Sequence, residues 1–226
     1  MIRKTLLVIT LFIFITNCSE NSSDYYPLNE GIKCEYNLVF NSSYSRKVVI
    51  ENMGKRELNK QTVVPIKTTF DNTASYTFVK ESEDGIQVVG EQGVNNINPI
   101  ILDSPRYIIK YPITKGNIWQ SKQKLIFASK GKEYVMTETI ESVGETVTTQ
   151  AGTFNNCIKI RGVGEVLIKD PWFGWMKSSS KVRIKIENID FYAPGIGFIK
   201  GYYKEKSNYL HVEGGEIMSG LLSIEK

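Results

Sequence analysis

The stretch Lys181-Val182-Arg183-Ile184-Lys185-Ile186 decides the fold class of this 226-residue chain. Basic residues alternate with aliphatic residues at every position. A period of two places successive side chains on opposite faces of a β-strand. We therefore predict a half-exposed strand here, with a basic outer face.

Further strand-like segments lie on both sides of this stretch. Many are rich in β-branched and aromatic residues, and turn compositions such as Asn41-Ser42-Ser43 and Glu83-Asp84-Gly85 separate them. We predict strands at residues 35–40, 44–51, 62–70, 75–80, 86–89, 120–129, 132–141, 145–149, 157–161 and 165–168, with more strands after residue 190. Apart from the first twenty residues, no long stretch has apolar residues at helical spacing. The sequence predicts an all-β protein.

Two nine-residue stretches share one pattern. Tyr26 to Cys34 and Tyr111 to Trp119 both read Tyr-Pro-aliphatic-x-x-Gly-x-x, followed by a large or apolar residue. Proline restricts the preceding residue to an extended conformation, and glycine permits a turn with positive φ. We interpret both stretches as strand-entry turns, with Cys34 and Trp119 facing a core. We treat residues 25–226 as a single β domain, in which an internal repeat would start at residues 25 and 110. The irregular residues 92–105 are the best internal boundary.

The first residues have the layout of a bacterial export signal. Arg3 and Lys4 precede an apolar run of about ten residues, too short for the roughly 20 that a spanning helix needs. Residues 15–18, Ile-Thr-Asn-Cys, resemble the bacterial lipoprotein cleavage box. That resemblance implies a signal helix at residues 1–17, removed before Cys18, which then carries the lipid. Residues 18–24 would form a short polar tether. The alternative is an ordinary signal peptide with a chance cysteine.

The charge balance and the residue after Cys18 bear on location and partners. The chain has 28 basic and 24 acidic residues, and no block rich in Lys and Arg stands out, which argues against a nucleic-acid partner. Ser19, rather than an aspartate, follows the lipidated position. By resemblance to the best-known Gram-negative sorting rule, this favours an outer membrane, with the body facing the periplasm.

Two cysteines remain in the body of the protein. An oxidising compartment would allow a disulfide between Cys34 and Cys157. The alternative is two separate buried thiols, and the sequence leaves both open because it does not give the Cα–Cα distance.

Several pieces of the body together resemble a family of uncharacterised bacterial envelope lipoproteins. These pieces are the two Tyr-Pro turns, Ala151-Gly152-Thr153-Phe154 and Tyr192-Ala193-Pro194-Gly195-Ile196-Gly197. The resemblance implies a curved, largely antiparallel β-sheet, either open and barrel-like or a sandwich. It supplies no catalytic residues. Cys34 departs from the aromatic residue expected in the first Tyr-Pro turn.

Catalytic and metal-binding patterns are weak. His211 is the only histidine, which excludes a multi-histidine zinc site, and no Gly-x-Ser-x-Gly elbow accompanies it. We interpret it as a surface residue on a strand. The glycine pairs at 162/164 and 195/197 lack the spacing and the following helix of a dinucleotide loop. We expect no metal, no cofactor and no enzymatic activity.

An aromatic loop is the sharpest anomaly of the sequence. Asp170-Pro171 and Ser178-Ser179-Ser180 bracket it, and lysines flank it. Its large apolar residues are Trp172, Phe173, Trp175 and Met176. The loop either folds inward to close one end of the sheet or offers an exposed tip to a membrane, a ligand or a protein.

The sequence thus predicts a lipid-anchored bacterial envelope protein with a membrane as its first partner. The favoured function is a non-enzymatic module that binds a hydrophobic ligand. The alternative is an envelope scaffold that acts through protein–protein contacts. An enzyme ranks last, because no nucleophile–base set is visible.

Overall fold

The computed structural model describes residues 22–169 and 181–225. In this part of the chain, one short 3-10 turn precedes a series of β-strands, which confirms the all-β prediction. The elements are η1 (Ser22–Tyr25), β1 (Lys33–Phe40), β2 (Tyr44–Asn52), β3 (Arg56–Leu58), β4 (Gln61–Phe70), β5 (Thr73–Ser82), β6 (Gly85–Gln92), β7 (Ile100–Lys110), β8 (Ile118–Lys124), β9 (Glu133–Thr149), β10 (Gly152–Lys169), β11 (Lys181–Ala193), β12 (Gly197–Ser207) and β13 (Gly215–Glu225).

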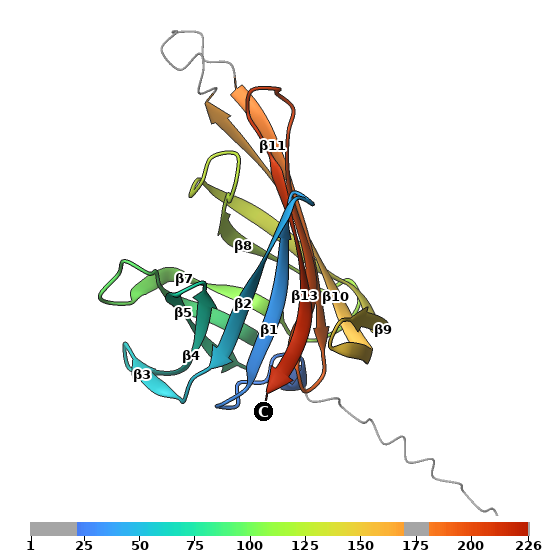
Figure 1. Ribbon diagram of the computed structural model, residues 1–226. Coiled ribbons are helices and arrows are strands. Elements are labelled where there is room, and N and C mark those ends of the chain that lie inside the picture. The colour runs from blue at the N-terminus through green and yellow to red at the C-terminus, as the bar shows by residue number, and fades with distance from the viewer. Residues whose placement is uncertain (1–21, 170–180, 226) are drawn as a thin grey trace, which may run out of the picture.

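All these strands belong to one curved antiparallel sheet (Figure 1). The order is β7-β6-β5-β4-β2-β1-β13-β12-β11-β10-β9-β8, and β3 adds to β4. Neighbours in this order are neighbours in the chain almost throughout. There are two exceptions: β2 pairs with β4, because β3 lies off this path, and β1 pairs with β13, which joins the two ends of the meander. The sheet therefore curls into a nearly closed barrel, the first of the two expected forms, with β7 and β8 as its two edges.

A backbone ladder with one bulge, between Glu35 and Tyr36, joins β1 to β13. Eight residue pairs run from Lys33 opposite Glu225 to Phe40 opposite Ile217, and an ion pair of 2.8 Å links the Lys33 and Glu225 side chains. Beneath the ladder, Tyr36 and Leu221 are buried opposite each other.

The two Tyr-Pro turns have the same geometry at their glycines, although the Tyr111-Pro112 bond is cis and the Tyr26-Pro27 bond is not. Gly31 and Gly116 take φ values of +86° and +88°, in the left-handed region that glycine enters without steric cost. The Gly31 N–H donates to the Asn52 carbonyl at 3.0 Å, and the Gly116 N–H donates to the Ile140 carbonyl at 2.8 Å. In each turn the N–H of that same residue, Asn52 or Ile140, donates to the carbonyl of the residue that follows the glycine. One turn leads into β1 and the other into β8.

Two of the apolar clusters of the core lie next to these turns. Cys34 and Trp119, which occupy equivalent positions after them, are each 5% exposed, as the pattern predicted. Cys34 and Cys157 are buried in one apolar cluster, and no disulfide joins them. Burial raises the pKa of the Cys157 thiol. Of the two alternatives, the structure has two buried thiols without a bridge.

Several predicted boundaries need correction. The strand predicted at 120–129 ends at Lys124, and the short strand β3 occupies a stretch that reads as polar turn. Pro65, a residue typical of an edge strand or a bulge, lies in the interior strand β4 where one side is locally open: the ladder to β2 ends at Ile66 and the ladder to β3 begins at Val63. A proline is tolerated there because no strand needs its missing N–H.

Two more corrections concern loops. Residues 100–105, predicted to be irregular, belong to β7. His211 lies in the turn between β12 and β13 instead of on a strand, and its ring meets the Tyr209 ring edge to face at 5.7 Å.

Some predictions concern residues outside the described part. These are the signal helix, the lipidation of Cys18 and the aromatic loop with Trp172, Phe173, Trp175 and Met176. The last residues of the predicted tether do appear, within η1, where the Asp24 carbonyl accepts a 2.7 Å hydrogen bond from the Gly195 N–H. Among residues 22–169 and 181–225, no helix is long and apolar enough to span a bilayer.

Candidate ligand-binding site

The barrel is interrupted between β7 and β8, which follow each other in the chain but do not pair. We call this interruption the seam. In Figure 1 the two strands diverge from the turn that connects them. A groove of about 580 Å³ lies between them. Leu102, Pro105 and Val135 supply its apolar lining, and Arg106, Ser121 and Gln123 supply polar groups beneath a charged rim. The other charged lining residues are Glu91, Asp103, Lys122, Lys124 and Glu133.

A chain of side-chain hydrogen bonds bridges the seam from β6 to β9. Arg106 donates to Glu91 at 2.9 Å on one side and to Gln123 at 3.2 Å on the other. Gln123 donates to the Ser121 hydroxyl at 3.1 Å, and Ser121 donates to a Glu138 carboxylate oxygen at 2.7 Å. Side chains thus link the two edges where a backbone ladder is missing. We call this set the polar bridge.

The inner end of the polar bridge is a buried acid. Glu138 is 7% exposed, and burial raises its pKa to about 7, helped by the negative charge of Asp190. The Ser121 hydrogen bond and the Arg106 charge oppose this shift only in part. Near neutral pH the Glu138 carboxyl is therefore divided between its charged and neutral forms.

Asp190 is the second acid of the inner wall. Burial raises its pKa to about 7 as well, against the hydrogen bond that it accepts from Asn188 at 2.6 Å. Asp190 faces Gly201 in the neighbouring strand. A Cβ at Gly201 would lie 2.9 Å from the Asp190 carboxylate and 2.8 Å from the Phe198 ring. Glycine at this position makes room for both side chains.

One row of side chains across the inner wall is only partly buried. Directly opposed residues of an antiparallel sheet share a face. The strand registers connect Glu138, Gly162, Asn188, Tyr203, Ile217 and Phe40 in this way. Of these, Asn188, Tyr203, Ile217 and Phe40 are only half-buried. The inner wall therefore offers both apolar and polar groups.

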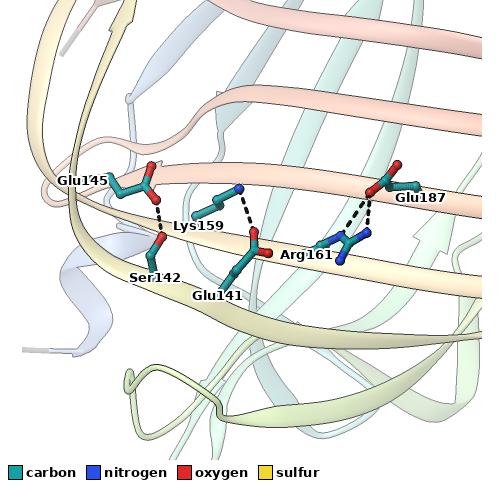
Figure 2. Close-up of polar contacts among 6 residues, drawn as sticks. All are labelled: Glu141, Ser142, Glu145, Lys159, Arg161 and Glu187. Carbon is teal, nitrogen blue, oxygen red and sulfur yellow. Dashed lines mark hydrogen bonds and ion pairs between the residues drawn. The ribbon is translucent and has the colours of Figure 1, made fainter.

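On the outer face of β9 to β11, in contrast to the inner wall, carboxylates form ion pairs (Figure 2). Lys159 pairs with Glu141 at 2.7 Å, and Arg161 pairs with Glu187 at 2.8 Å. Glu141 and Glu187 thus each have a cationic partner, and Glu145 accepts a hydrogen bond from the Ser142 hydroxyl. No ion pair within the described residues includes Glu138 or Asp190 of the inner wall.

A third inner carboxylate has a structural role. Glu205 is 2% exposed and accepts hydrogen bonds from the backbone N–H groups of residues 126, 127 and 128, at 2.5 to 3.2 Å. The Tyr203 hydroxyl donates to it at 2.7 Å. Because Glu205 holds this backbone in a turn, β8 ends at Lys124.

No cluster of three or more His, Cys, Asp or Glu in the described ranges could hold a metal ion. The sequence-predicted residues do not gather at the seam. Cys34 and Cys157 are buried elsewhere, and Cys18 and the aromatic loop lie outside the described residues. The polar bridge was missed, because its members are ordinary polar residues on four strands. A usable signal was the pair Ser121 and Gln123, polar residues that continue the inward face of Trp119.

No protein-family model matches this chain, and no curated protein matches it. Two solved structures are similar to it. One is provisionally described as an exported protein with a YMCC-like fold, from Bacteroides fragilis. It is 16% identical over 88% of this chain and 97% of that chain, with a TM-score of 0.38. The other is provisionally described as a lipoprotein, from Parabacteroides distasonis. It is 12% identical over 89% of this chain and 98% of that chain, with a TM-score of 0.41. At these scores neither likeness bears on what this chain does.

Proposed function

We propose that this protein is a lipid-anchored protein of the bacterial envelope, held at an outer membrane, that binds a hydrophobic ligand in the seam groove without catalysing a reaction. One observation carries the proposal: a nearly closed barrel stays open along one seam, and the groove there has the apolar side chains of Leu102, Pro105 and Val135 beside a polar bridge and a charged rim. Ligand sites combine apolar lining with a few placed polar groups in this way.

The N-terminal sequence supports the anchor. An apolar run and Cys18 lie only a few residues before η1, which packs against the domain through the hydrogen bond between Asp24 and Gly195. A lipid on Cys18 would therefore hold the domain close to the membrane surface.

The state of the polar groups supports a binding role. Arg106, Gln123 and Ser121 are each engaged by another member of the polar bridge. Two common catalytic arrangements are a nucleophile next to a base and a pair of acids on both sides of a substrate bond. Ser121 does lie next to the Glu138 carboxylate, but both side chains are buried within the bridge. The donors and acceptors of the bridge suit the orientation of a polar head group.

A scaffold role is the second candidate, and the unpaired edges of β7 and β8 favour it. Exposed strand edges present free backbone groups, with which another chain can pair. A partner strand would occupy the same seam, so the two candidates make opposite predictions for small-molecule binding.

The test compares two valines on the outer faces of adjacent strands. Val135 is 50% exposed and lines the groove, whereas Val163 is 44% exposed and lies outside it. The full-length protein, purified in detergent, is titrated with a fluorescent long-chain fatty acid. We expect Val135→Asp to weaken binding about tenfold, a change of about 1.4 kcal/mol, and Val163→Asp to change it less than about twofold.

Absence of saturable probe binding by the unchanged protein would contradict the ligand-binding proposal. Equal effects of both substitutions would contradict the placement of the site in the seam groove. Native mass spectrometry of protein extracted from its own membrane would show a co-purifying lipid, together with the acyl mass on Cys18.

A further inference from the structure

The connection between β6 and β7 presents an exposed aliphatic tip, which we define as residues 93–101. Ile97 is 92% exposed, Ile100 58%, Val94 56% and Ile101 40%. From Gly93 to Leu102 the chain has no charged residue. Single exposed aliphatic residues are ordinary, but four of them in nine uncharged residues form a patch that calls for a partner.

Hydrogen bonds hold the tip in this exposed form. The Gln92 side-chain amide donates to the carbonyls of Asn96 and Ile97, at 3.0 and 3.1 Å. The Asn96 N–H donates to the Gly93 carbonyl at 3.0 Å. The aliphatic side chains are therefore presented on a shaped turn, so that binding needs little further ordering of the backbone.

The composition of the tip favours a lipid bilayer over a protein partner. Energetically dominant residues of protein interfaces are enriched in Trp, Tyr and Arg, and the tip contains none of them. Entry into the interfacial layer of a bilayer is favoured by apolar side chains with no charge to desolvate. The tip supplies four such side chains beside the uncharged polar residues Asn95, Asn96 and Asn98. The chain outside the described residues also points to a membrane, because residues 6–15 are apolar and Cys18 follows them.

The tip lies next to the seam groove in the chain. Ile101 is followed directly by Leu102, which lines the groove. We propose that residues 93–101 insert into the interfacial layer of a lipid bilayer and place the seam groove at the membrane surface. An apolar ligand would then pass between bilayer and groove without crossing water. This passage rests on the proposed function, whereas the contact of the tip with the bilayer does not.

The chain offers a matched control. Leu210, in the turn between β12 and β13, is 97% exposed, as Ile97 nearly is. Its neighbours Tyr209, His211 and Glu213 are polar or charged, so the surroundings of Leu210 lack the uncharged character of the tip. A comparison of Ile97 with Leu210 therefore distinguishes membrane contact from the mere exposure of an aliphatic side chain.

The experiment measures the depth of each site directly. Nitroxide labels are attached to Ile97→Cys and Leu210→Cys in the full chain, reconstituted into vesicles of phosphatidylethanolamine and phosphatidylglycerol. The unsubstituted protein measures background labelling. Collision rates with oxygen, which concentrates in lipid, and with a water-soluble nickel complex give the position of each label.

We expect the oxygen-to-nickel ratio at residue 97 to be several-fold higher than at residue 210. Equal, water-like ratios at both sites would overturn the proposal. So would a label at 97 shielded from both reagents, because that result means contact with protein instead of lipid.

A second variant separates this proposal from the proposed function. Ile97→Asp with Ile100→Asp changes only side chains that are mostly exposed, so the fold should persist, as a thermal melt will verify. Binding of the fluorescent fatty acid in detergent should be unchanged, while its transfer from vesicles to the protein should slow at least tenfold. Unchanged transfer would overturn the role of the tip, and loss of binding in detergent would mean that the tip belongs to the binding site itself.

Discussion

The barrel has two junctions between its halves, and they are built in different ways. At the first junction, β1 and β13 meet through eight residue pairs over a buried apolar cluster. At the second, β7 and β8 meet only through side chains, with Arg106 and Gln123 in contact across the seam. The strands β1 and β8 begin with the same turn, so strand entry does not explain the difference. What differs is the wall behind each strand. It is apolar along the first junction, whereas at the second an apolar cluster with Ile109 and Trp119 gives way to the polar bridge.

The difference indicates which part of the sheet is stable and which part is adaptable. A backbone ladder over an apolar cluster opens only at high cost in free energy. A bridge of side-chain hydrogen bonds, each worth about 1 kcal/mol, opens at much lower cost. We therefore expect the molecule to open at the seam.

The largest effect on stability is expected at the first junction, between β1 and β13. Leu221 is completely buried, so Leu221→Ala should lower the free energy of unfolding by about 2–5 kcal/mol, through lost burial and the cavity left behind. Chemical denaturation measures this change. Ile118, 59% exposed on the seam strand β8, is the control, and Ile118→Ala should stay within about 0.5 kcal/mol. Equal losses would abolish the distinction between the junctions.

The next effect concerns the loop that follows β8. Glu205→Gln would turn a side-chain NH₂ group toward backbone N–H donors, and should cost about 2–3 kcal/mol. Glu165, exposed and paired with Arg183, is the control, and Glu165→Gln should cost less than about 1 kcal/mol. The same denaturation experiment compares them. A loss below that of the control would mean that Glu205 does not hold the loop.

The third effect is the pH dependence of stability. The native pKa of Glu138 is raised to about 7 from 4.5, so the native state binds this proton more tightly than the unfolded state. Its stabilising contribution is complete below pH 4.5 and is lost as the pH rises through 7, on the order of 2 kcal/mol. Asp190 acts in a similar window. Denaturation at several pH values should therefore show a shallower fall for Glu138→Gln.

Glu141, on the outer face, is the control of opposite sign. Its hydrogen-bonded ion pair with Lys159 lowers its pKa. Its stabilising contribution is present above pH 4.5 and is lost as the pH falls through its lowered native value. If Glu138→Gln leaves the pH profile unchanged, the carboxyl at the end of the polar bridge titrates normally.

The smallest effect on global stability is expected at the bridge itself. Gln123→Ala removes the contact across the seam and should cost about 1 kcal/mol or less. Amide hydrogen exchange should nevertheless quicken in β7 and β8, with no change in β1 and β13. Gln120→Ala, exposed on the same strand, should change neither. Faster exchange over the whole barrel would show that the seam does not open independently.

The sequence was informative where local patterns decide the outcome. In the stretch 181–186, Val182, Ile184 and Ile186 are at most 3% exposed and the three basic residues are exposed, as the alternation predicted. The strand predicted at 120–129 was too long because the cause of its end, Glu205, lies some eighty residues later in the chain. The candidate site was beyond local reasoning for the same reason, since the polar bridge exists only once four strands are in register. The exposed tip was readable in principle, as an uncharged segment with paired isoleucines, but we had taken it for a boundary.

The pairing of β1 with β13 also constrains how the molecule is assembled. Almost every other strand finds its partner within a few tens of residues, whereas β1 must await a partner that lies about 190 positions later. Contacts so distant in sequence form slowly, because a long loop has to close first. Until then, one side of β1 presents unsatisfied backbone groups to any passing polypeptide. During folding, β1 is therefore the strand most exposed to pairing with another chain.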